Sequence, residues 1–367
     1  MVLMNDFTAE PPALREAMVA AVRRVLESGW YVLGSEVSRF EGLWAAACGT
    51  QFGVGVGNGM DAIELALRAL DIGPGDEVIT TPMTAFATVL AILRAGATPI
   101  LADIDPETAL LAPASVRRCI SHRTKAMLLV HLYGQVRQMD EWRGLCDGAG
   151  IRLIEDCAQA HLASSQGTTA GAFGVAGAYS FYPTKNLGAP GDAGMLVTNH
   201  ATVAQRTSRL RNYGQSVRYQ HPELGMNSRL DEVHAAMLSE RLGWLDSFTQ
   251  RRREIAEHYR REIRSPRIGL LLAPESATSH VYHLFVVNCA QRDALQAHLQ
   301  ARQVQSNIHY PIPIHHQEPC RGLGRDPAGL GHSERHAATC LSLPCHPQLT
   351  SADVKTVIDA CNSFGAA

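Results

Sequence analysis

The feature that most constrains the fold of this chain is the alternation, between residues 52 and 197, of short apolar segments with amphipathic ones. The apolar segments have the length of strands, and the amphipathic segments carry apolar residues at helical spacing. Strands are expected at residues 52–56, 77–80, 98–103, 126–130, 151–155, 178–181 and 195–197, and helices at 61–70, 85–95 and 140–149. This alternation predicts an α/β fold with a mainly parallel, seven-stranded sheet covered on both faces. In such sheets ligands bind beyond the carboxyl ends of the strands.

The pattern changes after Asn227, where helix-forming residues dominate positions 230–263. The next expected strand lies at 281–287, followed by expected helices at 292–299 and 352–361. We therefore predict two units, an N-terminal segment with a large domain at 1–244 and a smaller α+β domain at 245–367. The chain has no glycine- and serine-rich linker, so the two units are expected to pack closely.

Composition argues against several classes of protein. The 33 Lys+Arg and 35 Asp+Glu give a formal net charge of -2, whereas a nucleic-acid-binding protein needs a basic surplus. No apolar run reaches the roughly 18 residues that span a membrane, and the N-terminus lacks the features of a signal peptide. The nine cysteines are scattered, odd in number and without a C-x-x-C motif, which favours free thiols in a reducing compartment. A cytoplasmic protein is therefore expected.

A glycine-rich segment, residues 53–59, follows the first expected strand and precedes a helix. The backbone N–H groups of such a turn, together with a helix N-terminus, can bind a phosphate group. The segment is equally compatible with a tight turn. The dinucleotide fingerprint G-x-G-x-x-G fails, because Asn58 or Met60 stands at its last glycine position. A nicotinamide-dependent enzyme is thereby disfavoured.

Two further residues stand where strands of this sheet are expected to end. Asp156 follows the strand at 151–155, where a carboxylate either meets a sheet ligand or caps the next segment. Lys185 follows the strand at 178–181 in a glycine-rich loop. Partial burial would lower its pKa and make the neutral amine a nucleophile for Schiff-base formation, and the alternative is a solvated surface lysine. A phosphate-binding turn, a strand-end carboxylate and a loop lysine together are what pyridoxal phosphate (PLP) requires.

The motifs that carry these residues resemble one enzyme family. They are GNGMDAIELAL, DCAQAH, SFYPTKNLGAPGDAG, GMNSRLDE and IHYPIPIH, in this order, and the resemblance covers residues 6–359. The chain resembles the DegT/DnrJ/EryC1/StrS aminotransferases, which are fold-type I, PLP-dependent enzymes acting on nucleotide-linked keto sugars. The resemblance implies an amino acid as the donor of the amino group, expected to be L-glutamate.

The resemblance also implies roles for individual residues. Lys185 matches the lysine that binds PLP covalently and moves the proton between the reacting carbons, and Asp156 matches the acid that pairs with the pyridine nitrogen. Asn227 matches an asparagine that the neighbouring subunit contributes to the phosphate, so a homodimer with shared active sites is expected. The other implied cofactor-binding positions are Asn58, Gly59, Met60, Ala85, Gln159 and Ser180.

Several positions depart from the family pattern. They are Met60 in place of threonine, Ala85 in place of a ring-stacking aromatic, Leu162 and Ala193 in place of glycine, and His234 in place of glutamine. None of them removes a catalytic group, so these departures are interpreted as tuning of the site. Phe86, next to Ala85, is expected to point elsewhere.

A cluster of arginines is the first candidate contact for the substrate. Five arginines between Arg206 and Arg229 and one acid, Glu223, give a local charge of +4. Such a patch suits a diphosphate, although similar clusters are often solvated helix faces. Our hypothesis is that Arg218 and Tyr219 meet the nucleotide sugar.

The second candidate is the extended loop at residues 307–316. In the family that the chain resembles, HYP-x-P-x-H lines the sugar site, which implies substrate contacts for His309 and Tyr310, with Tyr182 as a further candidate. The i,i+6 histidine spacing of this loop matches no known ligand pattern, so no metal is expected.

These observations lead to one functional prediction with alternatives. This variant of the loop is most similar to enzymes that aminate 3-keto-6-deoxy sugars, so a dTDP-linked 3-keto-6-deoxyhexose is the expected substrate. Similar loops serve 4-keto substrates. Dehydratases of the same family replace the lysine by histidine, so Lys185 favours amino transfer. A non-catalytic PLP-binding regulator is the remaining alternative.

Overall fold

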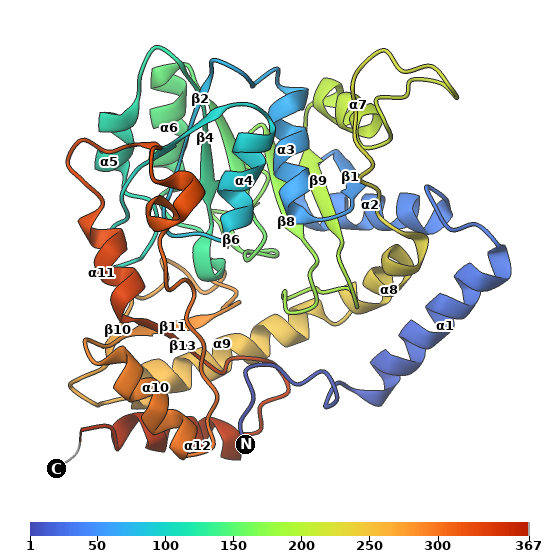
Figure 1. Cartoon of the computed structure of the whole chain (residues 1–367). Helices are drawn as coiled ribbons and strands as arrows, with labels where there is room; N and C mark the ends of the chain where they lie inside the picture. Colours follow the sequence, from blue (N-terminus) through green and yellow to red (C-terminus); the bar gives the residue numbers. More distant parts are fainter. Residues whose placement is uncertain (366–367) are drawn as a thin grey trace.

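The computed structural model describes residues 1–365, which contain an eight-stranded sheet in the upper half of the molecule (Figure 1). The strand order is β1-β9-β8-β5-β4-β2-β3-β12, and within these residues only β9 runs antiparallel to its neighbours. The predicted α/β fold with a mainly parallel sheet is confirmed. The strands are β1 (Phe52–Val56), β2 (Glu77–Thr80), β3 (Thr98–Leu101), β4 (Thr124–Val130), β5 (Arg152–Asp156), β8 (Ala176–Ser180), β9 (Gly194–Thr198) and β12 (Gly324–Arg325).

The eighth strand corrects the expected number of seven. β12 comes from the C-terminal part of the chain and pairs in parallel with β3, Gly324 with Ile100 and Arg325 with Leu101. Both of its residues are exposed, so β12 has neither the length nor the apolar pattern from which a strand is predicted. The C-terminal part of the chain therefore extends the edge of the large sheet.

Helices cover both faces of this sheet. They are α2 (Ser35–Cys48), α3 (Gly59–Ala69), α4 (Phe86–Arg94), α5 (Pro113–Cys119), α6 (Met139–Ala149) and α7 (Ala201–Leu210), while α8 (Glu232–Leu242) packs on α2 and α1 (Pro12–Ser28) packs on α8. Neighbouring residues of a strand point to opposite faces. Accordingly, Met127 of β4 packs in a cluster with Trp44 of α2, whereas Leu128 packs in another with Leu67 of α3. Burial of both faces explains why the central strands are mainly apolar.

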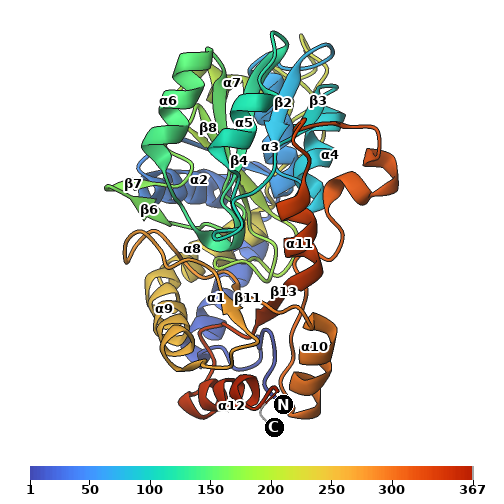
Figure 2. The same ribbon diagram turned by 90° about the vertical axis from the view of Figure 1, so that its left-hand side faces the viewer.

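A second, three-stranded antiparallel sheet with the order β10-β11-β13 lies in the lower half, among the C-terminal helices (Figure 2). Its core includes Val2, which bridges to Val304, so the chain begins against this sheet. The elements are α9 (Leu245–Glu262), β10 (Gly269–Leu270), β11 (Phe285–Asn288), α10 (Arg292–Ala301), α11 (Gly331–Thr339), β13 (Cys340–Leu343) and α12 (Ser351–Asn362). A domain boundary at residue 245 stays a prediction.

The expected strand at 281–287 begins four residues late, at Phe285. The N–H of Val281 instead donates to the carbonyl of Gly134 (2.9 Å), and Tyr282 has φ of 45°. These residues therefore connect the two sheets rather than extend β11. A short hairpin, β6 (Ser164–Ser165) and β7 (Thr168–Thr169), comes between β5 and β8 in the sequence.

Two further expectations concern membrane-spanning segments and the state of the cysteines. Among residues 1–365, no helix combines the length and apolar character needed to cross a membrane. All nine cysteines are buried and none forms a disulfide, as expected of free thiols.

Candidate active site

The predicted cofactor residues gather at the carboxyl ends of three strands that run in the same direction. Asp156 ends β5, Ser180 ends β8, and Asn58 follows β1 as the N-cap of α3. A Cβ added to Gly59 would lie 2.7 Å from Cβ of Ser180, so these two positions are in direct contact and only glycine can stand at 59. The strand ends thus bring together residues that are far apart in the sequence.

The N-terminus of α3 beside Ser180 provides a place for an anion. Asn58 caps the helix, because its Oδ1 accepts from the N–H of Asp61 (2.8 Å). The N–H groups of Gly59 and Met60 have no carbonyl within the helix to bind, and the positive end of the helix dipole lies there. Met60 directs its side chain toward the cluster between α3 and the sheet, so it contributes only its backbone N–H. These groups with the Ser180 hydroxyl can hold a phosphate.

Asp156 is buried and holds two hydrogen bonds. Thr88 donates its hydroxyl to Oδ2 (2.8 Å), and the N–H of Ala158 donates to Oδ1 (3.1 Å). Burial raises the pKa of Asp156, and the two hydrogen bonds and the charge of Lys185 oppose that rise. A role as a cap of the following segment accounts for the hydrogen bond from Ala158 but not for the one from Thr88. A carboxyl group in this state can share a proton with a heterocyclic nitrogen.

Lys185 lies in the loop between β8 and β9. Burial lowers the pKa of Lys185 to about 8, and Asp156 partly opposes this shift. Its backbone N–H donates to the carbonyl of Tyr182 (2.9 Å), and the amide of the next residue, Asn186, donates to the carbonyl of Val281 (2.9 Å). The side chain is therefore not a solvated surface lysine.

Gln159 connects this site to the loop at 307–316. Its Oε1 accepts from the N–H of Tyr133 (2.6 Å), and its Nε2 donates to the hydroxyl of Tyr310 (3.2 Å). His309 is next to Tyr310, and its Nδ1 lies 2.8 Å from the hydroxyl of Ser342. Burial lowers the pKa of His309 to about 4 and raises that of Tyr310 to about 12, so both are neutral near pH 7. His309 and Tyr310 thus lie beside the predicted cofactor residues.

Other predicted residues lie further out. Ala85 is the N-cap of α4, and Phe86 packs away from the site against Val89 and Ile314, as expected. Tyr182 is half exposed, and Tyr219 is 78% exposed. Arg218, Tyr219 and Asn227 form no hydrogen bond or ion pair with Lys185, Asp156 or Ser180 anywhere in residues 1–365. Asn227 is next to Ser228, whose hydroxyl accepts from the N–H of Gly57 (3.0 Å) beside the N-terminus of α3, whereas no such contact links Arg218 or Tyr219 to the cofactor residues in residues 1–365.

The arginine patch is less positive than its sequence count indicates. Arg206 pairs with Asp71 and Glu223, and Arg209 pairs with the same Glu223. Arg211 pairs with Glu41, an acid far away in the sequence. Arg218, in contrast, has no acidic partner in the described chain and lies over the ring of Tyr219, 5.0 Å from its centre. Asp71 and Glu41, which lie outside the segment, therefore compensate two of its four net positive charges.

Three of the departures from the family pattern stand in different local surroundings. Leu162 has φ of 60°, in the left-handed region that favours glycine. Ala193, by contrast, is not among the residues with positive φ, and its carbonyl accepts from the N–H of Phe181 (2.7 Å). His234 lies against Gly191 of the lysine loop, where an added Cβ would come within 3.0 Å of its ring.

Three polar residues at the site were not predicted. Thr88 binds Asp156, the N–H of Tyr133 binds Gln159, and His161 binds the lysine loop at both ends. His161 belongs to the quoted DCAQAH motif, so a signal for it existed, whereas Thr88 and Tyr133 lie in segments without a motif.

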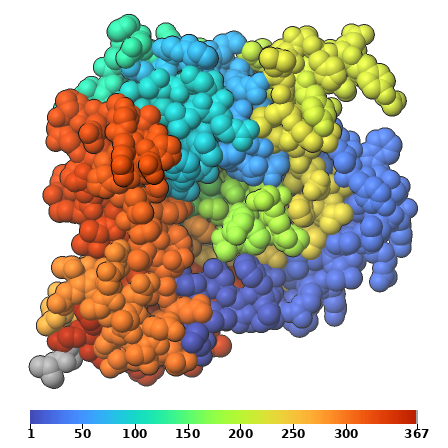
Figure 3. Space-filling view, viewed as in Figure 1, coloured from blue at the N-terminus to red at the C-terminus, as the bar shows by residue number. Residues whose placement is uncertain are grey.

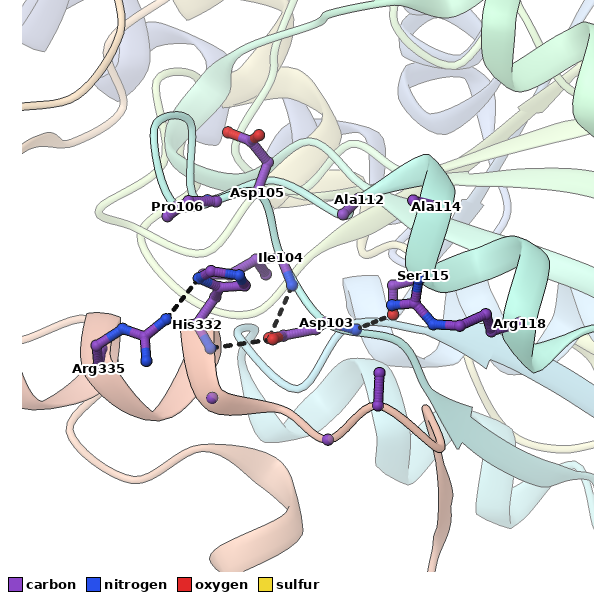
Figure 4. A pocket seen from close by; sticks show the side chains of 13 residues that line it. Asp103, Ile104, Asp105, Pro106, Ala112, Ala114, Ser115, Arg118, His332 and Arg335 are labelled. Carbon is purple, nitrogen blue, oxygen red and sulfur yellow. Dashed lines mark hydrogen bonds between the residues drawn. The ribbon is translucent and has the colours of Figure 1, made fainter.

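A separate pocket of about 480 Å³ lies between the end of β3 and the start of α11 (Figure 4). The carboxylate of Asp103 accepts from the N–H groups of His332 and Ser333 there, and Arg335 contacts His332. None of the predicted site residues lines it. Because its polar groups are hydrogen-bonded to one another, we interpret this pocket as part of the interface between α11 and the large sheet.

Comparisons with known proteins agree with this geometry. Residues 12–362 match the model of the DegT/DnrJ/EryC1/StrS aminotransferase family. A dTDP-3-amino-3,4,6-trideoxy-alpha-D-glucose transaminase of Streptomyces venezuelae is 44% identical over 97% of this chain and 94% of its own length. A dTDP-3-amino-3,6-dideoxy-alpha-D-galactopyranose transaminase of Aneurinibacillus thermoaerophilus is 44% identical over 94% of both chains.

Two further similarities extend the picture. A pleiotropic regulatory protein of Geobacillus stearothermophilus is 39% identical over 98% of both chains. The crystal structure of S. venezuelae DesV in complex with a ketimine intermediate is similar over 100% of this chain and 99% of that one, with a TM-score of 0.96 and 43% identity. The fold and the site thus define an aminotransferase. The chain belongs to the DegT/DnrJ/EryC1/StrS aminotransferase family.

The residues present fit the PLP cofactor on which this family depends. The N-terminus of α3 with Ser180 can take the phosphate, Asp156 can take the pyridine nitrogen, and Lys185 can take the aldehyde. Gly59 lets the N-terminus of α3 approach Ser180 closely, because a side chain there would collide with Ser180. The donor set therefore covers the three ends of the cofactor.

Proposed function

We propose that this enzyme transfers an amino group from an amino acid, expected to be L-glutamate, to carbon 3 of a dTDP-linked 3-keto-6-deoxyhexose, with PLP as cofactor. The partly buried Lys185, whose pKa burial lowers to about 8, carries the proposal, because amino transfer needs an amine that can lose its proton close to physiological pH. Both transaminases reported above are named for a 3-amino sugar linked to dTDP and lacking the 6-hydroxyl.

In this proposal each side chain of the site has a separate role in the reaction. When bound, PLP supplies a ring that withdraws electrons from the carbon that loses its proton. The amine of Lys185 removes that proton from the donor and later returns one to the sugar carbon. Asp156 holds the proton on the ring nitrogen, and Gln159 connects the ring's surroundings to Tyr310 of the sugar-binding loop. Hydrogen bonds from Thr88 and from the N–H of Tyr133 keep Asp156 and Gln159, respectively, in place.

The alternatives predict different products. A 4-keto substrate would give a 4-amino sugar, and a dehydratase would give a deoxygenated sugar without an added nitrogen. A regulator would bind PLP without turnover, and the pleiotropic regulatory protein keeps this alternative open to test. The presence of Lys185, where the dehydratases have histidine, favours the aminotransferase over the dehydratase, and turnover with an amino donor distinguishes it from the regulator.

We further propose that the active unit is a homodimer with shared active sites, in the cytoplasm. Large apolar side chains are exposed in two segments, and a monomer would leave them in water. One segment follows α1 and includes Trp30 (63% exposed), and the other, residues 213–224, projects at the upper right in Figure 3 and includes Leu224 (90% exposed). Nine buried free thiols suit a reducing compartment.

The visible absorbance spectrum of the purified enzyme with PLP tests the donor reaction. The wild type should show a band of lysine-bound PLP that L-glutamate converts to the pyridoxamine phosphate form, and Lys185→Ala should show no such conversion. The dTDP-linked 3-keto and 4-keto sugars are then supplied separately, and the products are identified by mass spectrometry and NMR. Amination at carbon 4, deoxygenation, or a band that no amino acid changes would each support an alternative instead.

A further inference from the structure

The lysine loop is closed at both ends by one side chain, His161. Its Nε2 lies 3.0 Å from the carbonyl oxygen of Ser180, and its Nδ1 lies 3.0 Å from the backbone nitrogen of Leu187. Ser180 is the last residue of β8, and Leu187 comes two residues after Lys185. His161 therefore connects the end of a strand to the segment that carries the lysine.

The two partners determine the tautomer of His161. A backbone N–H can only donate, so Nδ1 must accept from Leu187, and a carbonyl can only accept, so Nε2 must donate to Ser180. The ring is therefore neutral, with its proton on Nε2. Burial and, to a smaller extent, the charge of Lys185 lower the pKa of His161 to about 3, so this form persists across the physiological range.

The ring of His161 is also fixed by packing. It is fully buried, and its centre lies 5.4 Å from the ring of Trp44, 5.6 Å from that of Tyr179 and 5.5 Å from that of Phe181. Three aromatic neighbours leave the imidazole no room to rotate, because interiors are close-packed. The two hydrogen bonds therefore join rigid groups.

The two ends of the loop differ in what else holds them. Ser180 is paired with Gly194 of β9, so the sheet fixes its position without His161. On the lysine side, Nδ2 of Asn186 donates to the carbonyl of Val281 (2.9 Å), and further along the loop the N–H of Ala189 donates to the carbonyl of Phe181 (2.7 Å). Loss of His161 should therefore displace the lysine side of the loop and leave the phosphate side in place.

We propose that His161 is a positioning residue, which holds Lys185 at the distance and angle required for reaction by tying Leu187 to the end of β8. The proposal rests on the proposed role of Lys185 toward PLP. A correctly placed amine reacts with a bound aldehyde at a high effective concentration, and a displacement of the loop lowers that concentration. Binding that does not involve the amine is unaffected.

Pyridoxamine phosphate provides the measurement that isolates this effect, because it has an amine where PLP has an aldehyde and forms no bond to Lys185. The dissociation constants of both compounds are measured by equilibrium dialysis for the wild type and for His161→Phe, which keeps an aromatic ring but has no hydrogen bonds. The variant should bind PLP about 10-fold or more weakly. Its affinity for pyridoxamine phosphate should change by less than about 3-fold, since the phosphate and ring contacts remain.

Two matched variants separate the hydrogen bonds from a general loss of packing. The amide oxygen of His161→Asn can accept from Leu187 as Nδ1 does, whereas the amide of His161→Gln reaches toward Ser180 as Nε2 does. His161→Asn should recover most of the PLP affinity, and His161→Gln should recover less. If His161→Phe does not fold, the ratio of PLP to pyridoxamine phosphate affinity in these two variants decides the question.

The lysine variant supplies the remaining control. In Lys185→Ala, the additional change His161→Phe should leave the affinity for PLP unaltered, because no amine remains to be positioned. Equal weakening of both compounds, or a further loss in the double variant, would overturn the role of His161. Failure of the wild type to bind PLP would instead overturn the proposed function itself, so the two results are distinguishable.

Discussion

Burial acts on the two central side chains in opposite directions, since it raises the pKa of Asp156 and lowers that of Lys185 to about 8. Each shift favours the neutral form, because charge is costly away from water. Thr88 opposes the effect at Asp156, since its hydroxyl donates to the carboxylate and stabilises the ionised form. A single hydroxyl thus adjusts how readily Asp156 can pair with a protonated ring nitrogen.

Thr88→Val tests that adjustment. Valine keeps the shape of threonine but removes the donor, so the pKa of Asp156 should rise further and the ionised form should be rarer. Loss of one hydrogen bond to a charged group corresponds to about 10-fold weaker binding of PLP. Equilibrium dialysis measures the affinity, and Thr88→Ser, which keeps the hydroxyl, is the control. Equal affinity in the valine variant and the wild type would show that the bond does not affect the cofactor.

Lys185 should become reactive at a lower pH than an ordinary lysine. The neutral amine is the reactive form, and with a pKa of about 8 it makes up half of the population near pH 8. Below that pH the amine gains its proton and reactivity falls. Labelling of the cofactor-free enzyme with an amine reagent across pH 6–11 (roughly the range of lysine titration), followed by mass spectrometry, gives the profile. The exposed Lys125 and Lys355 are internal references, and a profile for Lys185 that coincides with theirs would contradict the prediction.

Sequence reasoning found Lys185 and Asp156 because a lysine in a glycine-rich loop and an acid at a strand end are visible as residue types in context. It did not find the N–H of Tyr133, which binds Gln159, because a backbone donor has no sequence signature. Thr88 was not predicted for a related reason. Its partner is 68 residues away, and threonine is common in helices that bind nothing.

At the scale of helices and loops, buried carboxylates from distant segments replace local caps. Glu232 of α8 accepts from the N–H groups of Gly34 (2.8 Å), Glu36 (2.9 Å) and Val37 (2.9 Å) and so caps α2. Asp103 acts in the same way on α11, and Glu155 accepts three backbone N–H groups of the turn at 171–174. The sequence around α2 offers no cap of its own, since Gly34 precedes it.

Glu232→Ala should therefore destabilise the protein. The substitution leaves three N–H groups without an acceptor in a buried position, which should lower the free energy of unfolding by about 2–4 kcal/mol. Urea denaturation followed by circular dichroism measures it. The adjacent Asp231→Ala is a matched control, because Asp231 is exposed and its side chain makes no cap bond. Destabilisation of the same size in both variants would mean that the three bonds contribute nothing specific.

The remote caps also explain which elements could be predicted. The strands of the large sheet are apolar runs buried on both faces, so their expected positions agree with β1 and β2 residue for residue and with the others nearly so. The helices α2, α5 and α7 and the strand β12 were not predicted; α2 is capped from α8, and β12 exists only by pairing with β3. The determinants of α2 and β12 lie in other parts of the chain.

At the scale of the whole molecule, residues 213–227 form a projecting segment in which one chain leaves several large side chains exposed. Arg218 has no acidic partner in the described chain, Tyr219 and Leu224 are largely exposed, and Asn227 is exposed at the base of the segment. A homodimer would place this projecting segment against a second copy, as the family resemblance implies for Asn227. The active site would then contain residues of both chains.

Mixing two inactive variants tests that arrangement. If Asn227 acts across the interface, a dimer of one Lys185→Ala chain and one Asn227→Ala chain has one site with both residues intact and one site with neither. Random exchange after mild denaturation and renaturation then restores roughly a quarter of the wild-type activity, since about half of the dimers are mixed and each has one good site. If Asn227 acts within its own chain, every site in the mixed dimer lacks one residue and no activity returns. Size-exclusion chromatography of differently tagged chains verifies that exchange has occurred, so the absence of activity would itself be decisive against a shared site.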